Sequence, residues 1–102
     1  MAVGFDLFVV FAEMRTGSNL LEDYLNQING ITCHGEAFNP NFIGYPNRDE
    51  IMGVTQRQRE DNPDRLLRAI RGGTEGLDGF RYFHDHEPRV LVPILSDPRC
   101  AK

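Results

Sequence analysis

The feature that most constrains this chain is a hydrophobic run followed by a short polar turn and an amphipathic segment. Residues 5–12, FDLFVVFA, are almost continuously apolar and rich in aromatic and β-branched side chains, which is typical of a strand covered on both faces in a parallel sheet. From Ser18 to Ile28 apolar residues recur with helical spacing, and Asn29-Gly30 can end a helix. The sequence therefore predicts a buried strand, a tight turn and a helix with one apolar face.

The predicted turn has the chemistry of an anion site. A helix that begins after a glycine-containing turn directs unpaired backbone N–H groups and a partial positive charge at the space above the strand. Arginine adds a permanent charge and a planar fork of donors suited to phosphate or sulfate. The candidate binding residues are Arg15, Thr16, Gly17, Ser18 and Asn19. The alternative is an ordinary strand–turn–helix unit with an exposed arginine.

This turn lacks the early glycine and the lysine of the nucleotide-binding pattern G-x-x-x-x-G-K-[ST]. The segment RTGSNLL, residues 15–21, instead resembles the phosphosulfate-binding loop of sulfotransferases, which reads R-[ST]-G-[ST]-[ST]-L-L in bacterial and carbohydrate-directed members. The resemblance implies an α/β fold of the P-loop-NTPase-like sulfotransferase type, with a parallel sheet flanked by helices. It implies that residues 15–19 hold the 5′-phosphosulfate of 3′-phosphoadenosine 5′-phosphosulfate, and it requires no metal.

A second candidate site residue follows the next predicted strand, residues 31–33, which we expect beside the first strand. The segment HGEAF then places His34 and Glu36 at the carboxyl end of that strand, the edge where ligands bind in open parallel sheets. A carboxylate there can take the proton of an acceptor hydroxyl. The segment also resembles a G-E-x-F element of bacterial sulfotransferases, whose glutamate is the proposed base. Glu36 is the candidate base, with His34 an alternative and a plain surface carboxylate the simplest reading.

Residues 48–71 are the most charged stretch, with nearly balanced signs. Asn62-Pro63 predicts a helix start at Pro63, with a short preceding helix within residues 48–60. The simplest interpretation is a solvated helix surface with pairs such as Asp64 and Arg68, and the sharper one is an arginine clamp for an acidic acceptor. The aromatic loop at residues 38–47 can contact a sugar ring or pack on the domain.

Residues 74–102 repeat the strand and helix rhythm. We expect a strand over residues 77–83, a helix from Pro88 and the lead-in to another strand at residues 99–102. Between them, GFRYFHDHEPRV resembles the bacterial subgroup, which implies that one of His84 and His86 positions the acceptor or acts as base. Of the two we name His86 as the candidate catalytic residue. The H-x-H spacing of His84 and His86 also suggests a metal site as a hypothesis. However, the only further histidine that could act as a third ligand is His34.

Composition narrows the classes of partner. A net charge of −4 and a pI near 5.2 argue against a protein that coats nucleic acid or membrane surfaces. Neither a membrane span nor a cationic signal region is present in the sequence, so we expect a cytoplasmic protein. Cys33 and Cys100 have no C-x-x-C partner and are expected to be free buried thiols.

The resemblance extends over residues 1–102, taken as a single domain. In the family an arginine after the next strand and a later serine bind the 3′-phosphate, so we expect these residues to be the N-terminal part of a sulfotransferase domain truncated at its C-terminus. An open sheet edge would then favour self-association. Three readings compete: a sulfotransferase acting on a carbohydrate or similar hydroxyl, a nucleotide-dependent phosphotransferase of the kinase type, and a non-catalytic remnant that acts by protein interaction.

Overall fold

The centre of the molecule is a four-stranded sheet in which all paired strands run parallel. The computed structural model describes residues 5–13 and 17–102. The strands lie in the order β2-β5-β1-β6, and their bounds are β1 (Leu7–Phe11), β2 (Ile31–Cys33), β5 (Leu77–Tyr82) and β6 (Cys100–Ala101). The predicted α/β class with a parallel sheet is confirmed, and so are the predicted strands at 31–33, 77–83 and 99–102 to within a residue or two.

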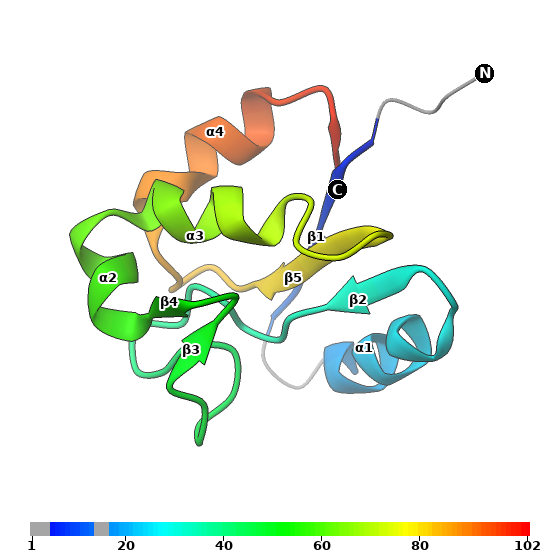
Figure 1. Ribbon diagram of the computed structural model, residues 1–102, viewed down its shortest axis with the longest axis horizontal. Helices are drawn as coiled ribbons and strands as arrows, with labels where there is room; N and C mark the ends of the chain where they lie inside the picture. The colour runs from blue at the N-terminus through cyan, green and yellow to red at the C-terminus, as the bar shows by residue number, and fades with distance from the viewer. Residues whose placement is uncertain (1–4, 14–16) are drawn as a thin grey trace.

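Helices cover both sides of this sheet. They are α1 (Ser18–Gln27), α2 (Gln56–Asp61), α3 (Pro63–Ile70), the 3-10 helix η1 (Pro88–Val90) and α4 (Leu91–Ser96). Figure 1 shows α1 on one side of the sheet and α3 and α4 on the other. Right-handed crossovers produce this arrangement when the chain leaves β1 in one direction along the sheet and later leaves β5 in the opposite direction.

The strand order corrects one prediction, because β5 lies between β1 and β2. Gly79 of β5 is the register partner of Phe8 on one side and of Cys33 on the other. A side chain at position 79 would put its Cβ 2.2 Å from the carbonyl oxygen of Phe8, so glycine permits this close approach. β5 is buried from Asp78 to Tyr82, which suits a central position, whereas β2 has only three residues and fits an edge.

The stretch between β2 and α3 also differs from the prediction. A two-stranded hairpin, β3 (Glu50–Ile51) and β4 (Val54–Thr55), occupies the start of the segment in which we expected a short helix. The hairpin turn uses Met52 and Gly53, both with positive φ, a conformation that interrupts a helix. α2 therefore begins only at Gln56, where Thr55 and Gln58 form a capping box.

The main hydrophobic core lies between the sheet and the helices α3 and α4. α3 begins at Pro63 as predicted, and the predicted stripe of Leu66, Leu67 and Ile70 is buried. Phe38 from the aromatic loop is fully buried, with its ring centroid 5.0 Å from that of Phe80. The aromatic loop thus contributes to the core at that position.

The opposite helix, α1, contradicts its expected orientation. Leu20, Tyr24 and Ile28 are exposed, while Glu22 is only 5% exposed. The reason is a buried ion pair between Glu22 and Arg81 of β5, described below, which sets the rotation of the helix about its axis. The prediction of the buried face used only the spacing of apolar residues, so it could not anticipate an ion pair with a distant strand.

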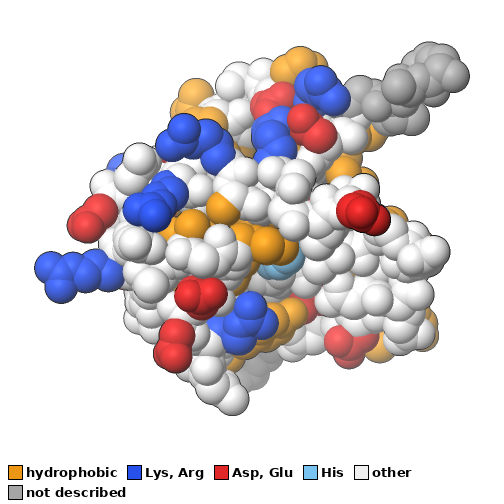
Figure 2. Space-filling model, viewed as in Figure 1, with side chains coloured by type: hydrophobic (Ala, Val, Ile, Leu, Met, Phe, Trp, Pro, Cys, Tyr) orange, Lys and Arg blue, Asp and Glu red, His pale blue; other side chains and the backbone are white. Residues whose placement is uncertain are grey.

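The charged stretch forms a surface of mixed sign. In Figure 2 basic and acidic side chains are interspersed over α2 and α3. The predicted pair of Arg68 and Asp64 is present at 2.9 Å, with both side chains more than half exposed. The interpretation of this stretch as a solvated helix surface therefore holds for Arg68 and Asp64. Arg59 is an exception, because its side chain is buried.

Candidate functional site

The carboxyl ends of β1 and β5 meet at a topological switch point. These strands are neighbours in the sheet, yet β1 leads to α1 and onward to β2, whereas β5 leads to α4 and onward to β6. The two connections run in opposite directions and leave a crevice beyond the strand ends, which is where ligands bind in open α/β sheets. Four of the candidate residues, Gly17, Asn19, Glu36 and His86, line a cavity at this edge of the sheet.

The amino end of α1 points toward this crevice. Gly17 is its N-cap residue, with φ 85° and ψ 12°, and none of the described side chains caps this end. First-turn N–H groups of a helix have no partner within the helix, so they are free to bind an anion. Gly17 and Asn19 line a cavity here. Arg15, Thr16 and the side chain of Ser18 lie outside the described residues.

That cavity has a volume of about 460 Å³, and we call it the polar cavity because most of its lining residues are polar or charged. It is bounded by the start of α1, by the loop after β2 and by the end of β5. Its lining residues are Gly17, Asn19, Glu36, Asn39, Asn41, Phe42, Arg81, Phe83, Asp85 and His86. The structure thus brings together four of the predicted site residues: Gly17, Asn19, Glu36 and His86.

Glu36 is held in a defined position in this cavity. Asn39 Nδ2 donates to Glu36 Oε1 at 3.1 Å, and Arg81 Nη2 lies 3.5 Å from Glu36 Oε2. The backbone of Glu36 is also fixed, because its N–H donates to the carbonyl oxygen of Gly44 and its own carbonyl accepts from the Gly44 N–H. The carboxylate remains 18% exposed toward the cavity. A base must be both oriented and reachable, and Glu36 meets both conditions.

Arg81 was not identified as a site residue from the sequence. It is 3% exposed, and its Nε donates to Glu22 Oε1 at 2.6 Å. Glu22 also accepts from the Tyr45 hydroxyl and from the Cys33 thiol, the latter at 3.6 Å. Buried charges persist only when paired and hydrogen-bonded. An arginine inside the apolar segment GFRYF was the signal that could have revealed this pair.

The environment of Glu22 shifts the pKa of two of its three donors, Cys33 and Tyr45. Burial, followed by the nearby Glu22 carboxylate, raises the pKa of the Cys33 thiol to about 12. Burial and the hydrogen bond to Glu22 raise the pKa of the Tyr45 hydroxyl. Both groups therefore stay protonated at neutral pH and act as hydrogen-bond donors, and the prediction of free buried thiols is confirmed for Cys33 and Cys100.

His86 lies beneath the same cavity and is 2% exposed. Its ring stacks on Phe83, with centroids 5.0 Å apart and planes 5° apart. The Phe83 N–H donates to His86 Nδ1 at 3.3 Å, and His86 Nε2 lies 3.3 Å from Glu36 Oε1. Burial lowers the pKa of His86, although the Glu36 carboxylate acts in the opposite direction. The ring is therefore neutral at physiological pH.

The other two histidines lie elsewhere. His34 Nε2 is 2.9 Å from the carboxylate of Asp78, whose second oxygen accepts from Thr74, so His34 belongs to a structural cluster between β2 and β5. His84 is exposed and pairs with Glu13 at 2.9 Å. Neither lines the polar cavity that contains Glu36.

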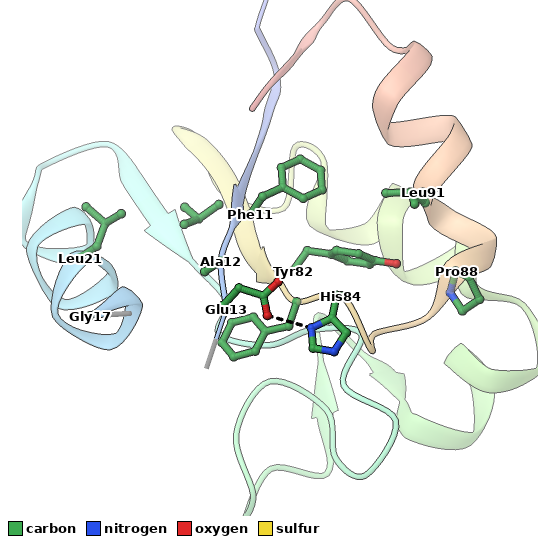
Figure 3. Close-up of a pocket in the computed structure, with 11 residues that line it drawn as sticks. Phe11, Ala12, Glu13, Gly17, Leu21, Tyr82, His84, Pro88 and Leu91 are labelled. Atoms are coloured by element: carbon green, nitrogen blue, oxygen red, sulfur yellow. Dashed lines mark hydrogen bonds and ion pairs between the residues drawn. The ribbon is translucent and has the colours of Figure 1, made fainter. Parts of the chain in front are cut away.

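A second, largely apolar cavity of about 790 Å³ lies beside the first. Figure 3 shows Glu13 and His84 facing each other at its centre, with Leu21 of α1 on one side and Leu91 of α4 on the other. Gly17 and Phe83 line both cavities. The amino end of α1 therefore stands between a polar and an apolar compartment.

Arg59 has a role that the charge pattern did not indicate. It is 2% exposed, and one guanidinium nitrogen donates to the carbonyl oxygens of Ala37 and Phe42 at 2.7 and 2.9 Å. Burial lowers its pKa. Arg59 thus fixes the loop that carries Glu36, Asn39 and Asn41.

Comparison with family models, with curated proteins and with solved structures finds no match for this chain. Within residues 5–13 and 17–102 no three His, Cys, Asp or Glu side chains are grouped so that they could hold a metal ion. None of the described helices combines the length and apolar character needed to cross a membrane.

Proposed function

We propose that the chain is part of a sulfotransferase that moves a sulfuryl group from 3′-phosphoadenosine 5′-phosphosulfate to a hydroxyl of a carbohydrate or a similar acceptor. The observation that carries the proposal is the juxtaposition at the switch point. The amino end of α1, which no described side chain caps, and the oriented carboxylate of Glu36 line one polar cavity. One offers donors for an anion, and the other offers a base for a hydroxyl.

In the proposed reaction, the donor's phosphosulfate lies at the start of α1. The N–H groups of residues 17–19, together with Arg15, neutralise the charge that develops on the leaving phosphate oxygen. The acceptor enters the polar cavity, where Glu36 takes its proton as the oxygen–sulfur bond forms. The finer assignment to a P-loop-like sulfotransferase fold, with residues 1–102 as its N-terminal portion, is part of this proposal.

The in-line geometry of group transfer supports this division of the site. Nucleophile and leaving group lie on opposite sides of the transferred group. Gly17 lines both cavities, whereas Glu36 lines only the polar one. We therefore assign the polar cavity to the acceptor.

The first experiment is a titration of ¹⁵N-labelled protein with adenosine 3′,5′-bisphosphate, followed by amide NMR. We expect the largest shifts at residues 17–20. Arg15→Ala should weaken binding at least tenfold, since a hydrogen bond to a charged group contributes about 1.5–3 kcal/mol. Arg68→Ala is the matched control, because Arg68 is exposed and pairs only with Asp64 among the interactions described.

Two outcomes would count against the proposal. Shifts confined to segments away from the start of α1 would place the anion elsewhere. Binding of ATP with Mg²⁺ in preference to the bisphosphate would favour the kinase-type reading. For catalysis, Glu36→Gln should abolish sulfuryl transfer to a soluble sugar while donor binding stays within twofold of wild type, and a fully active variant would remove Glu36 from the reaction.

A further inference from the structure

His86 has a single proton position that follows from its contacts. Its Nδ1 accepts the Phe83 N–H at 3.3 Å, and its ring is held by stacking on Phe83. A neutral imidazole with Nδ1 as acceptor carries its proton on Nε2. The protonated Nε2 lies 3.3 Å from Glu36 Oε1 and 4.0 Å from Asp85 Oδ1.

This Nε2–H is an exception among buried polar groups. Despite the short distance to Glu36, the atom makes no hydrogen bond of acceptable geometry to any described residue. Buried donors in folded proteins are almost always paired, so an unsatisfied one calls for an explanation, such as a bound water, an ion or a catalytic role. Hydrogen bonds around a catalytic group are often poorly aligned in the free protein and tighten when the ligand binds.

We infer that His86 is a positioning residue, whose Nε2–H aligns the carboxylate of Glu36 when an acceptor hydroxyl donates to that carboxylate in the polar cavity. The inference rests on the proposed function, in which Glu36 is the base. The transferred proton moves from the hydroxyl oxygen to Glu36, and His86 keeps its own proton throughout. His86 is thereby excluded as the base, because one ring nitrogen accepts the Phe83 N–H and the other is already protonated.

Other hydrogen-bond donors around the Glu36 carboxylate also help to orient it. Arg81 Nη2 lies 3.5 Å from Glu36 Oε2, while His86 and Asn39 face Oε1, so donors flank both carboxylate oxygens. Of the two candidate histidines, this inference concerns His86, which lies near Glu36. His84 instead pairs with Glu13 beside the apolar cavity.

The first test needs no substrate. NMR titration of the His86 ring should show the Nε2–H tautomer in the neutral protein. The Glu36 carboxylate opposes the effect of burial on the pKa of His86, with smaller help from Asp85 and opposition from Arg59. Glu36→Gln should therefore lower this pKa further, and Asp85→Asn should lower it less. A proton on Nδ1, or an unchanged pKa in Glu36→Gln, would overturn the inference.

The second test uses transfer from the phosphosulfate donor to a soluble sugar. His86→Phe keeps the ring packing and should lower kcat at least fivefold with the donor KM unchanged. His86→Gln places an amide N–H near the position of Nε2–H and should restore most of the rate, and Arg68→Gln, at an exposed residue of α3, is the control. Equal losses in His86→Phe and His86→Gln would refute alignment by the N–H. If residues 1–102 show no transfer, the bisphosphate titration at the start of α1 decides the proposed function, and the ring titration decides the His86–Glu36 contact.

Discussion

The strongest prediction concerns the buried pair of Glu22 and Arg81. Their side chains are 5% and 4% exposed, and Arg81 Nε lies 2.6 Å from Glu22 Oε1. Arg81→Met removes the cation and leaves the Glu22 carboxylate buried without it. Breaking a buried pair in this way costs about 3–5 kcal/mol. A domain of 102 residues has a total stability of about 5–15 kcal/mol, so this variant should lie close to its unfolding threshold.

The assay is urea unfolding followed by circular dichroism. Glu22→Met should also destabilise the protein, whereas the double variant should lose less than the two single variants combined, because replacing both charges by apolar groups removes the desolvation cost. Arg68→Met is the matched control, since the Arg68–Asp64 pair is similarly close at 2.9 Å but exposed. Exposed pairs of this kind contribute about 0.3–0.5 kcal/mol.

The reasoning would be refuted if Arg81→Met cost no more than Arg68→Met, or if the two single effects simply added. Either result would mean that water reaches Glu22, or that burial of the pair carries no energetic consequence. The same variants report on the site. Because Arg81 also contacts Glu36, Arg81→Met should displace the carboxylate even where the fold survives.

Three further predictions follow from single contacts. Burial lowers the pKa of His86, so the unfolded chain binds a proton near pH 6.5 that the folded chain does not. Wild type should therefore lose stability relative to His86→Gln as pH falls from about 7 to about 5, by at most about 1.4 kcal/mol per pH unit in urea unfolding. Gly79→Ala should destabilise by about 1–3 kcal/mol or more in the same assay, because the added Cβ would meet the Phe8 carbonyl oxygen at 2.2 Å. Arg59→Met removes two hydrogen bonds to loop carbonyl oxygens and should cost about 1–3 kcal/mol, with the largest amide NMR shifts at residues 37–42.

Each of these has a clear contrary result. Parallel pH–stability curves for wild type and His86→Gln would show that His86 titrates alike in both states. A Gly79→Ala variant as stable as wild type would mean that β1 and β5 can separate without cost. Shifts spread evenly over the chain in Arg59→Met would indicate that Arg59 does not act on the loop in particular.

Local patterns were enough to predict most of the elements. The apolar run before the turn gives β1, and the Asn62-Pro63 step gives the start of α3. Both depend on interactions within a few residues, namely side-chain periodicity and the fixed φ of proline. Glu36 could be placed at the ligand-binding edge for a similar reason, since it closely follows a strand of a parallel sheet.

Long-range pairings could not be read in this way. The insertion of β5 between β1 and β2 depends on the close approach of Gly79 to Phe8, two residues far apart in the chain. The rotation of α1 depends on Arg81, which draws Glu22 inward and leaves Leu20 and Tyr24 exposed. Hydrophobic periodicity predicts that charged residues face the solvent, so it cannot predict a charged residue that is buried in an ion pair.

The sequence by itself determined a parallel α/β domain with a glycine-containing turn before a helix and a carboxylate at one edge of the sheet, because strand and helix periodicity and turn chemistry are local properties. Only the tertiary structure decided which groups surround that carboxylate. Arg81, Asn39 and His86 meet at Glu36 because the sheet order sets the end of β5 beside the loop after β2. The proton position of His86 and the burial of Arg81 depend on distances between segments that are far apart in the sequence, and only folding sets those distances.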